Sequence, residues 1–155
     1  MAVIQVIQFT QDQMRILSGI SVETLRHWRS VVPYLAGKTG KAARFGFGDV
    51  VGLAVLREVV DNFGMQLKGV SAPVDQAFRL LSAATFADLE SSVLCLTAQG
   101  AALMHTGDAT RLVDAAVVVP LAPIVERLRG QMLPVGDAPR QAPLPYPPKA
   151  VRSPS

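Results

Sequence analysis

Apolar and polar residues in the first twenty positions predict a short helix after an irregular or β-like apolar lead. Thr10 is followed three residues later by Gln13, the spacing of a capping box at the start of a helix. Met14 and Leu17 then give the helix one apolar face. Gly19 stands where a helix ends in a left-handed turn, so we expect the helix to end there.

A second capping residue followed by apolar residues at helical spacing comes directly after this turn, and it predicts a second helix. Ser21 can cap a helix that runs to about Ser30, and Leu25 and Trp28 lie three residues apart on its inner face. Two short helices joined by residues 18–20 give the pattern of a helix-turn-helix, whose turn often contains glycine.

Residues 33–47 have the composition of a loop, and two longer helices are predicted after it. Asp49 is expected to cap a third helix, which Gly64 ends. Its apolar positions follow helical spacing: Val50, Leu53, Leu56, Val60 and Phe63. A fourth helix is expected at residues 73–83, with Pro73 in its first turn. Its apolar face contains Val74, Ala77, Phe78 and Leu81.

The next region predicts a small sheet. Residues 92–96 and 101–105 flank Gln99-Gly100, which is typical of a β-hairpin, although Leu89, Val93 and Leu96 also fit a helix. Residues 117–119 are expected to form a further strand, and residues 121–129 a short amphipathic helix.

Composition changes after residue 132, where a proline-rich tail begins. Seven of the eleven prolines lie between Pro134 and Pro154, which is typical of an extended, disordered segment. The sequence therefore predicts an α+β fold in three parts. Residues 1–72 form the helix-turn-helix domain, residues 73–131 a small α+β region, and residues 132–155 the tail.

Charge is concentrated in the first part of the chain. The 155 residues are 50% hydrophobic and 17% charged, enough apolar material for a sizeable core. Residues 1–70 carry eight Lys/Arg and five Asp/Glu, whereas residues 71–155 carry seven of each. Nineteen residues without an acid contain five cations: Arg26, Arg29, Lys38, Lys41 and Arg44. Such a cluster suits either a polyanion-binding surface or a solvated face.

Three motifs in order resemble the MerR family of DNA-binding proteins. Residues 19–28 read Gly-Ile-Ser-Val-Glu-Thr-Leu-Arg-His-Trp, close to the family's Gly-Val-Ser-x-x-Thr-Leu-Arg and two aromatics, with His27 in place of the first aromatic. Residues 44–50 resemble the end of its wing, and residues 64–70 the lead into the following helix. The resemblance covers about residues 8–72 and implies a winged helix-turn-helix.

The resemblance implies a site on double-stranded DNA. The helix at 21–30 would read the major groove, through Ser21, Glu23, Thr24, Arg26, His27 and Arg29. The wing at 37–47 would contact the DNA backbone, through Lys38, Lys41 and Arg44. Other roles remain open: Trp28 as a core residue, Glu23 as a partner of its helix dipole, and Arg44 as a tie to the third helix through an acid.

The expected function is a homodimeric transcription regulator, since one small winged helix covers about one half-site. The long coiled-coil helix typical of the family is not evident, which leaves ligand sensing and promoter untwisting in doubt. The alternative is a phage-type excisionase or small terminase-like packaging module. RNA polymerase, or a recombination or packaging protein, is then the expected partner. A third interpretation is a protein-interaction module that has lost DNA binding.

Other functional classes have little support in the sequence. Cys95 is the single cysteine, which excludes an intrachain disulfide and favours a reducing, cytoplasmic location. The longest strongly apolar stretch, residues 115–125, is too short to span a bilayer. Cys95 and His105 are solitary, so no metal site is expected. We expect no cofactor, no catalytic residue and no enzymatic activity.

Overall fold

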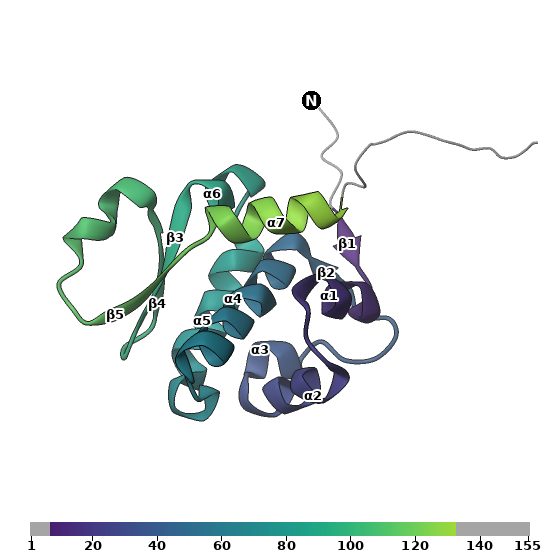
Figure 1. The fold of residues 1–155 in the computed structure, drawn as a ribbon. Coiled ribbons are helices and arrows are strands. Elements are labelled where there is room, and N and C mark those ends of the chain that lie inside the picture. The colour runs from purple at the N-terminus through teal and green to yellow at the C-terminus, as the bar shows by residue number, and fades with distance from the viewer. Residues whose placement is uncertain (1–6, 133–155) are drawn as a thin grey trace, which may run out of the picture.

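The chain begins with two helices joined by a tight turn in the computed structural model, which describes residues 7–132 (Figure 1). Helix α1 (Gln11–Ser18) starts after Thr10, whose hydroxyl accepts the N–H of Gln13. It ends at Gly19, where φ is 75°. Helix α2 (Val22–Val31) starts after Ser21, whose hydroxyl accepts the N–H of Thr24 at 3.0 Å. The predicted caps of both helices are confirmed.

Two short elements interrupt the segment that was expected to be a loop. Helix α3 (Pro33–Ala36) has its proline at the first position and buries Leu35 completely. Strand β2 (Phe45–Gly46) pairs antiparallel with β1 (Gln8–Phe9). The loop prediction for these residues is wrong, because the glycines between them do not prevent the flanking apolar residues from reaching the core.

Helix α4 (Phe47–Phe63) starts three residues earlier than predicted. Gly46 holds the cap position, and Asp49 lies in the first turn with a carboxylate that accepts the Gly46 N–H at 2.9 Å. The prediction that Asp49 is the cap residue is therefore wrong. Asp49 lies inside the helix, and from there its side chain accepts the N–H of the cap residue, Gly46. Gly64 ends α4 as expected, with φ of 65°.

Helices α4 and α5 pack closely. A 3₁₀ turn, η1 (Leu67–Val70), leads into α5 (Ser71–Ala83), and a further short helix, α6 (Phe86–Glu90), was not predicted. A Cβ atom on Gly48 would lie 2.6 Å from the carbonyl carbon of Leu81, and one on Gly52 would lie 2.5 Å from the ring of Phe78. Only glycine permits this approach of the two helices.

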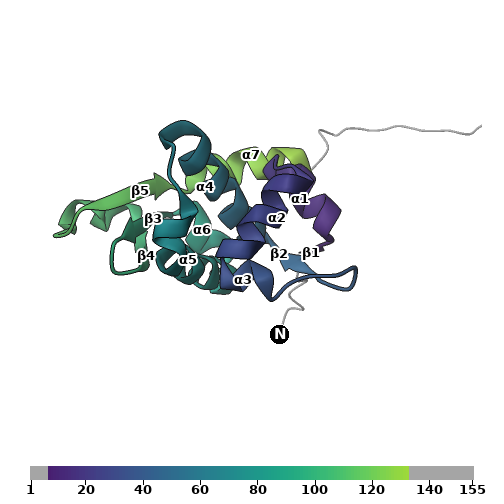
Figure 2. The same cartoon turned by 90° about the horizontal axis from the view of Figure 1, so that it is seen from below.

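A three-stranded antiparallel sheet follows, in the order β4-β3-β5. Strands β3 (Ser92–Thr97) and β4 (Ala101–His105) form the predicted hairpin, so the helical alternative is rejected. A 3₁₀ segment, η2 (Thr106–Arg111), leads to β5 (Ala116–Pro120), which pairs with β3 on its other side. Figures 1 and 2 show the sheet on one side of α4 and α5, and α1–α3 on the other. Helix α7 (Ala122–Met132) extends the predicted last helix by three residues.

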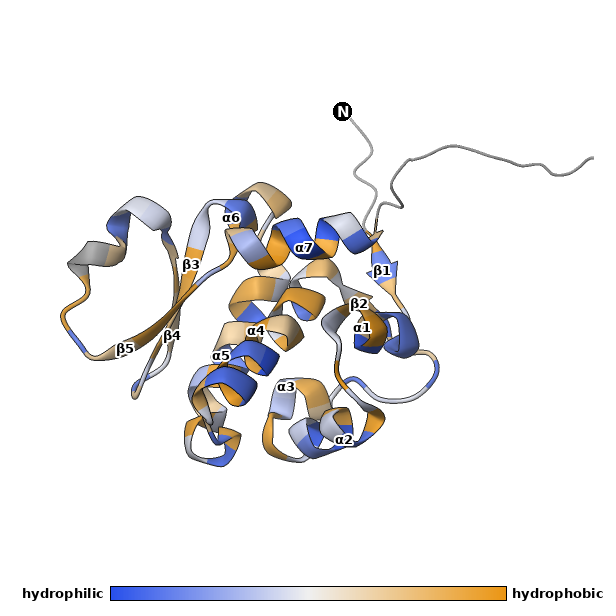
Figure 3. Cartoon of the chain, in the orientation of Figure 1, coloured by the Kyte–Doolittle hydropathy of each residue, from blue (hydrophilic) through white to orange (hydrophobic). Residues whose placement is uncertain are grey.

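One hydrophobic core joins all of these elements except η2. Buried residues of one cluster extend from Phe9 to Leu128, on both sides of the predicted boundary after residue 72. Helix α4 is buried almost all round from Gly48 to Leu56, as expected of a central helix. Figure 3 shows hydrophobic residues gathered along α4, α5 and the strands. The predicted α+β class is confirmed. The predicted tail lies outside the described residues except for Met132, which belongs to α7.

Candidate nucleic-acid interface

The turn between α1 and α2 is held by backbone bonds and by Arg15. The N–H groups of Gly19 and Ile20 both donate to the carbonyl of Arg15, at 2.9 and 3.2 Å. Nη1 of Arg15 in turn donates to the carbonyl of Ile20 at 3.3 Å, and the Ile20 side chain is buried. These contacts fix the direction in which α2 leaves the turn.

Helix α2 has one buried and one exposed face. Leu25 and Trp28 are 1% and 3% exposed and face the core, as the sequence predicted. The opposite face is polar and exposed at Ser21, Glu23, Arg26 and His27. The other two predicted contact residues, Thr24 and Arg29, are half-buried.

Several predicted contact residues already have partners within the helix. The hydroxyl of Ser21 donates to that of Thr24 at 2.9 Å, so both belong to the cap of α2. Nη1 of Arg26 lies 3.0 Å from Oε1 of Glu23, and their side chains are 69% and 82% exposed. Exposed helical pairs three or four residues apart contribute about 0.2–0.5 kcal/mol, so Arg26 can leave Glu23 at little cost.

Arg29 fastens three segments together. Its Nη2 donates to Oε1 of Gln11 in α1 and to the carbonyl of Lys38, both at 2.7 Å. Burial lowers the pKa of Arg29 below its ordinary value. The side chain thus joins α1, α2 and the loop of residues 37–44, which we call the basic loop, and it has less freedom to reach a ligand than Arg26.

A buried carboxylate, absent from the predicted site, holds the basic loop through the side chain of Lys38. Asp49 is 1% exposed and accepts the hydroxyl of Tyr34 at 2.7 Å and Nζ of Lys38 at 3.1 Å. Burial alone would lower the pKa of Lys38, but the hydrogen bond and charge of Asp49 outweigh it, so the pKa is raised. Nζ of Lys38 also lies 5.4 Å from the centre of the Tyr34 ring.

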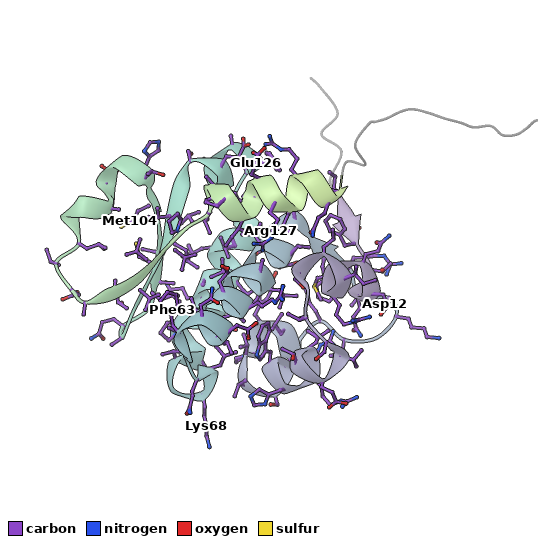
Figure 4. All side chains as sticks on the ribbon, in the orientation of Figure 1. Asp12, Phe63, Lys68, Met104, Glu126 and Arg127 are labelled. Carbon is purple, nitrogen blue, oxygen red and sulfur yellow. The ribbon has the colours of Figure 1, made fainter. Side chains whose placement is uncertain are left out.

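Lys41 and Arg44 are the exposed cations of the basic loop. Nη1 of Arg44 donates to the carbonyls of Lys41 and Ala43, at 2.9 and 3.0 Å, and to no acid among the described residues. The sequence left open an ion pair between Arg44 and an acid of the third helix. In the part of the chain that the structure describes, Lys38 forms such a pair, and Arg44 does not. A hollow of about 560 Å³ lies between this loop and the start of α1, where Figure 4 labels Asp12.

Residues 7–132 contain no candidate metal site. No three His, Cys, Asp or Glu side chains lie close enough together there to hold a metal ion. Cys95 is fully buried, with Sγ 3.5 Å from Sδ of Met104, and burial raises the pKa of its thiol. Within the same residues no helix has the length and apolar character needed to cross a membrane.

Comparison of the chain with models of protein families, with curated proteins and with solved structures gives no match.

Proposed function

We propose that the chain is a sequence-specific binder of double-stranded DNA, with a MerR-like winged helix-turn-helix formed by residues 8–72. Helices α1 and α2 would be the helix-turn-helix, and the basic loop with β1 and β2 the wing. The observation that carries the proposal is the bond from Arg29 to the basic loop, at 2.7 Å. This bond joins α2, which has an exposed polar face, to the loop that carries the exposed cations Lys41 and Arg44.

The contacts within the site divide the proposed roles. Arg26 and His27 are exposed in the first two turns of α2, the part of a recognition helix that reaches base edges. Arg26 can exchange Glu23 for a bidentate contact with guanine. Lys41 and Arg44 would neutralise phosphates, whereas Arg29 and Lys38 hold the wing in place.

The function supported best is that of a homodimeric transcription regulator in the cytoplasm, since two copies would read two half-sites. Residues 7–132 contain no long coiled-coil helix of the kind typical of MerR regulators. We therefore retain a second candidate function, that of an excisionase or a small terminase-like packaging protein. The longest helix after α4, α5, has 13 residues. A regulator should select a two-fold symmetric site, and the second candidate should select phased or direct repeats.

The test is selection of bound fragments from random duplexes, followed by affinity measurements across a range of salt concentrations. If Lys41 and Arg44 of each of two copies neutralise one phosphate each, the logarithmic salt slope is about −3.6. Arg26→Ala should relax the preference at one base position by about 1–3 kcal/mol. Lys41→Ala should weaken binding to all sequences alike and make the slope less steep by about 0.9 for each copy.

A matched control is Arg129→Ala. Arg129 lies on α7 and pairs with Glu90, and Figure 1 shows α7 and α2 on opposite sides of α4. Its loss should leave both the selected sequence and the salt slope unchanged. The proposal is wrong if no sequence is selected and if neither Arg26→Ala nor Lys41→Ala changes DNA binding while both variants remain folded.

A further inference from the structure

The outer edge of β5 has backbone groups that no described strand covers. The order β4-β3-β5 makes β5 an edge strand. The N–H of Leu121 donates to the carbonyl of Ser92 in β3 at 3.2 Å. Because alternate residues of an antiparallel strand bond to opposite sides, Val119 and Val117 also bond to β3. Residues 116, 118 and 120 therefore direct their backbone groups away from β3.

This edge has only one of the features that normally prevent strand pairing, a proline at its end. Edge strands are commonly protected by charged side chains, bulges or proline. Strand β5 reads Ala-Val-Val-Val-Pro and carries no charge. Pro120 removes one outward N–H, but Ala116 and Val118 retain theirs, and the Val118 side chain is 39% exposed.

An apolar groove continues the core beyond the same edge. It has a volume of about 520 Å³ and lies between the end of α4, β5 and the start of α7. Val117 and Val119 line it, and so does Phe63, which is 78% exposed. Figure 4 labels Phe63 at the end of α4 and Arg127 on α7. A strand added beside β5 would direct alternate side chains into this groove.

We propose that β5 of a second copy of the chain occupies this edge, antiparallel to the first and about a two-fold axis at Val118. In this register Val118 bonds to its symmetry mate in both directions, and the N–H of Ala116 bonds to the carbonyl of Pro120 at each end. Four backbone bonds form, and the missing N–H of Pro120 costs only the two outermost ones. Val117 of each copy then lies opposite Val119 of the other, on the face of the sheet that lines the groove.

The charges at the groove also suit a second copy. Glu58 of α4 and Arg127 of α7 both line it, and neither forms an ion pair within the described residues. A two-fold axis brings the acidic side of one groove towards the basic side of the other, which is what an isologous interface requires. The inference extends the proposed function, which calls for two copies on each DNA site.

The first test is the mass of the protein in solution, by sedimentation equilibrium, for Val118→Pro and for Val118→Thr. The wild type should have twice the chain mass of 16.5 kDa. The proline variant loses two intersubunit bonds, so its dimer should dissociate at least about 30 times more readily. Threonine retains the N–H and should remain dimeric. Pro120 shows that β5 accepts proline at an outward position, and circular dichroism verifies the fold.

The second test is cross-linking through Val118→Cys in a Cys95→Ala background, because Cys95 lies opposite Val118 in β3. Paired residues at the axis lie about 5.5 Å apart between Cα atoms, within reach of a disulfide. The control Ala116→Cys faces Pro120 of the other copy and should not cross-link to itself.

The proposal is overturned by a monomeric wild type, by a folded Val118→Pro variant that stays dimeric, or by equal cross-linking at both positions. Each of these readings is made without DNA, so it is separate from the test of DNA binding. A dimer with the expected cross-link that selects no DNA sequence would overturn only the proposed function.

Discussion

Replacing Asp49 with alanine removes the acceptor on which the basic loop and the start of α4 converge. In the native protein its carboxylate accepts the Tyr34 hydroxyl at 2.7 Å, the Gly46 N–H at 2.9 Å and the Lys38 ammonium at 3.1 Å. The alanine variant leaves all three donors without this partner. The Lys38 side chain is 32% exposed and can recover part of its hydration, but Asp49 itself is 1% exposed.

The expected loss of unfolding free energy is about 3–4 kcal/mol. Hydrogen bonds to a charged group contribute about 1.5–3 kcal/mol each, but they do not add fully here because water reaches Lys38 in the variant. Breaking a buried ion pair by removing one partner costs about 3–5 kcal/mol, which gives the same range. Urea unfolding followed by circular dichroism measures this loss, and a slope near 2 kcal/mol/M gives a midpoint lower by about 1.5–2 M.

Two further variants decide whether the cluster is the cause. In a double-mutant cycle, Asp49→Ala and Lys38→Met should couple by about 1–2 kcal/mol, because their side chains are in direct contact. Asp61→Ala is the control, since Asp61 is 59% exposed and pairs with Arg57 at 3.5 Å, and it should cost less than about 0.5 kcal/mol. A loss below about 1 kcal/mol for Asp49→Ala, or additive effects in the cycle, would refute the reasoning.

Two more measurements test the packing. Gly48→Ala should cost about 2–4 kcal/mol in urea unfolding, because its Cβ would meet the Leu81 backbone, whereas Gly69→Ala, with open space around it, should change stability by less than about 0.5 kcal/mol. Equal effects of the two substitutions would contradict the close packing of α4 on α5. Cys95 is fully buried with a raised pKa, so thiol reagents at neutral pH should label it at least about 100 times faster in urea than in the folded protein. Rapid labelling of the folded protein would show that the sheet opens.

The elements predicted best are those with local signals. Thr10, Gly19 and Gly64 act within five residues of the backbone groups that they satisfy, so the sequence alone predicts both ends of α1 and the C-terminal end of α4. The short helices α3 and α6 were missed because a four- or five-residue helix is not stable by itself. Each has a local start signal, Pro33 in α3 and Thr85 with Asp88 in α6. Both helices nevertheless depend on burial of Leu35 and Leu89 against distant parts of the chain, which these signals do not predict.

The same distinction explains what the sequence could not predict about the candidate site. A run of cations without an acid predicts where positive charge lies, but not which cations are already bound. Lys38 is paired with an acid eleven residues away, and Arg29 with a carbonyl nine residues away. Helical spacing reports neither contact, because the chain between the partners includes a loop. A sequence that lacks Asp49 would have the same run of cations at residues 26–44 and one more mobile cation in the loop. The buried acid therefore lowers the number of cations available for phosphates while it fixes the position of those that remain.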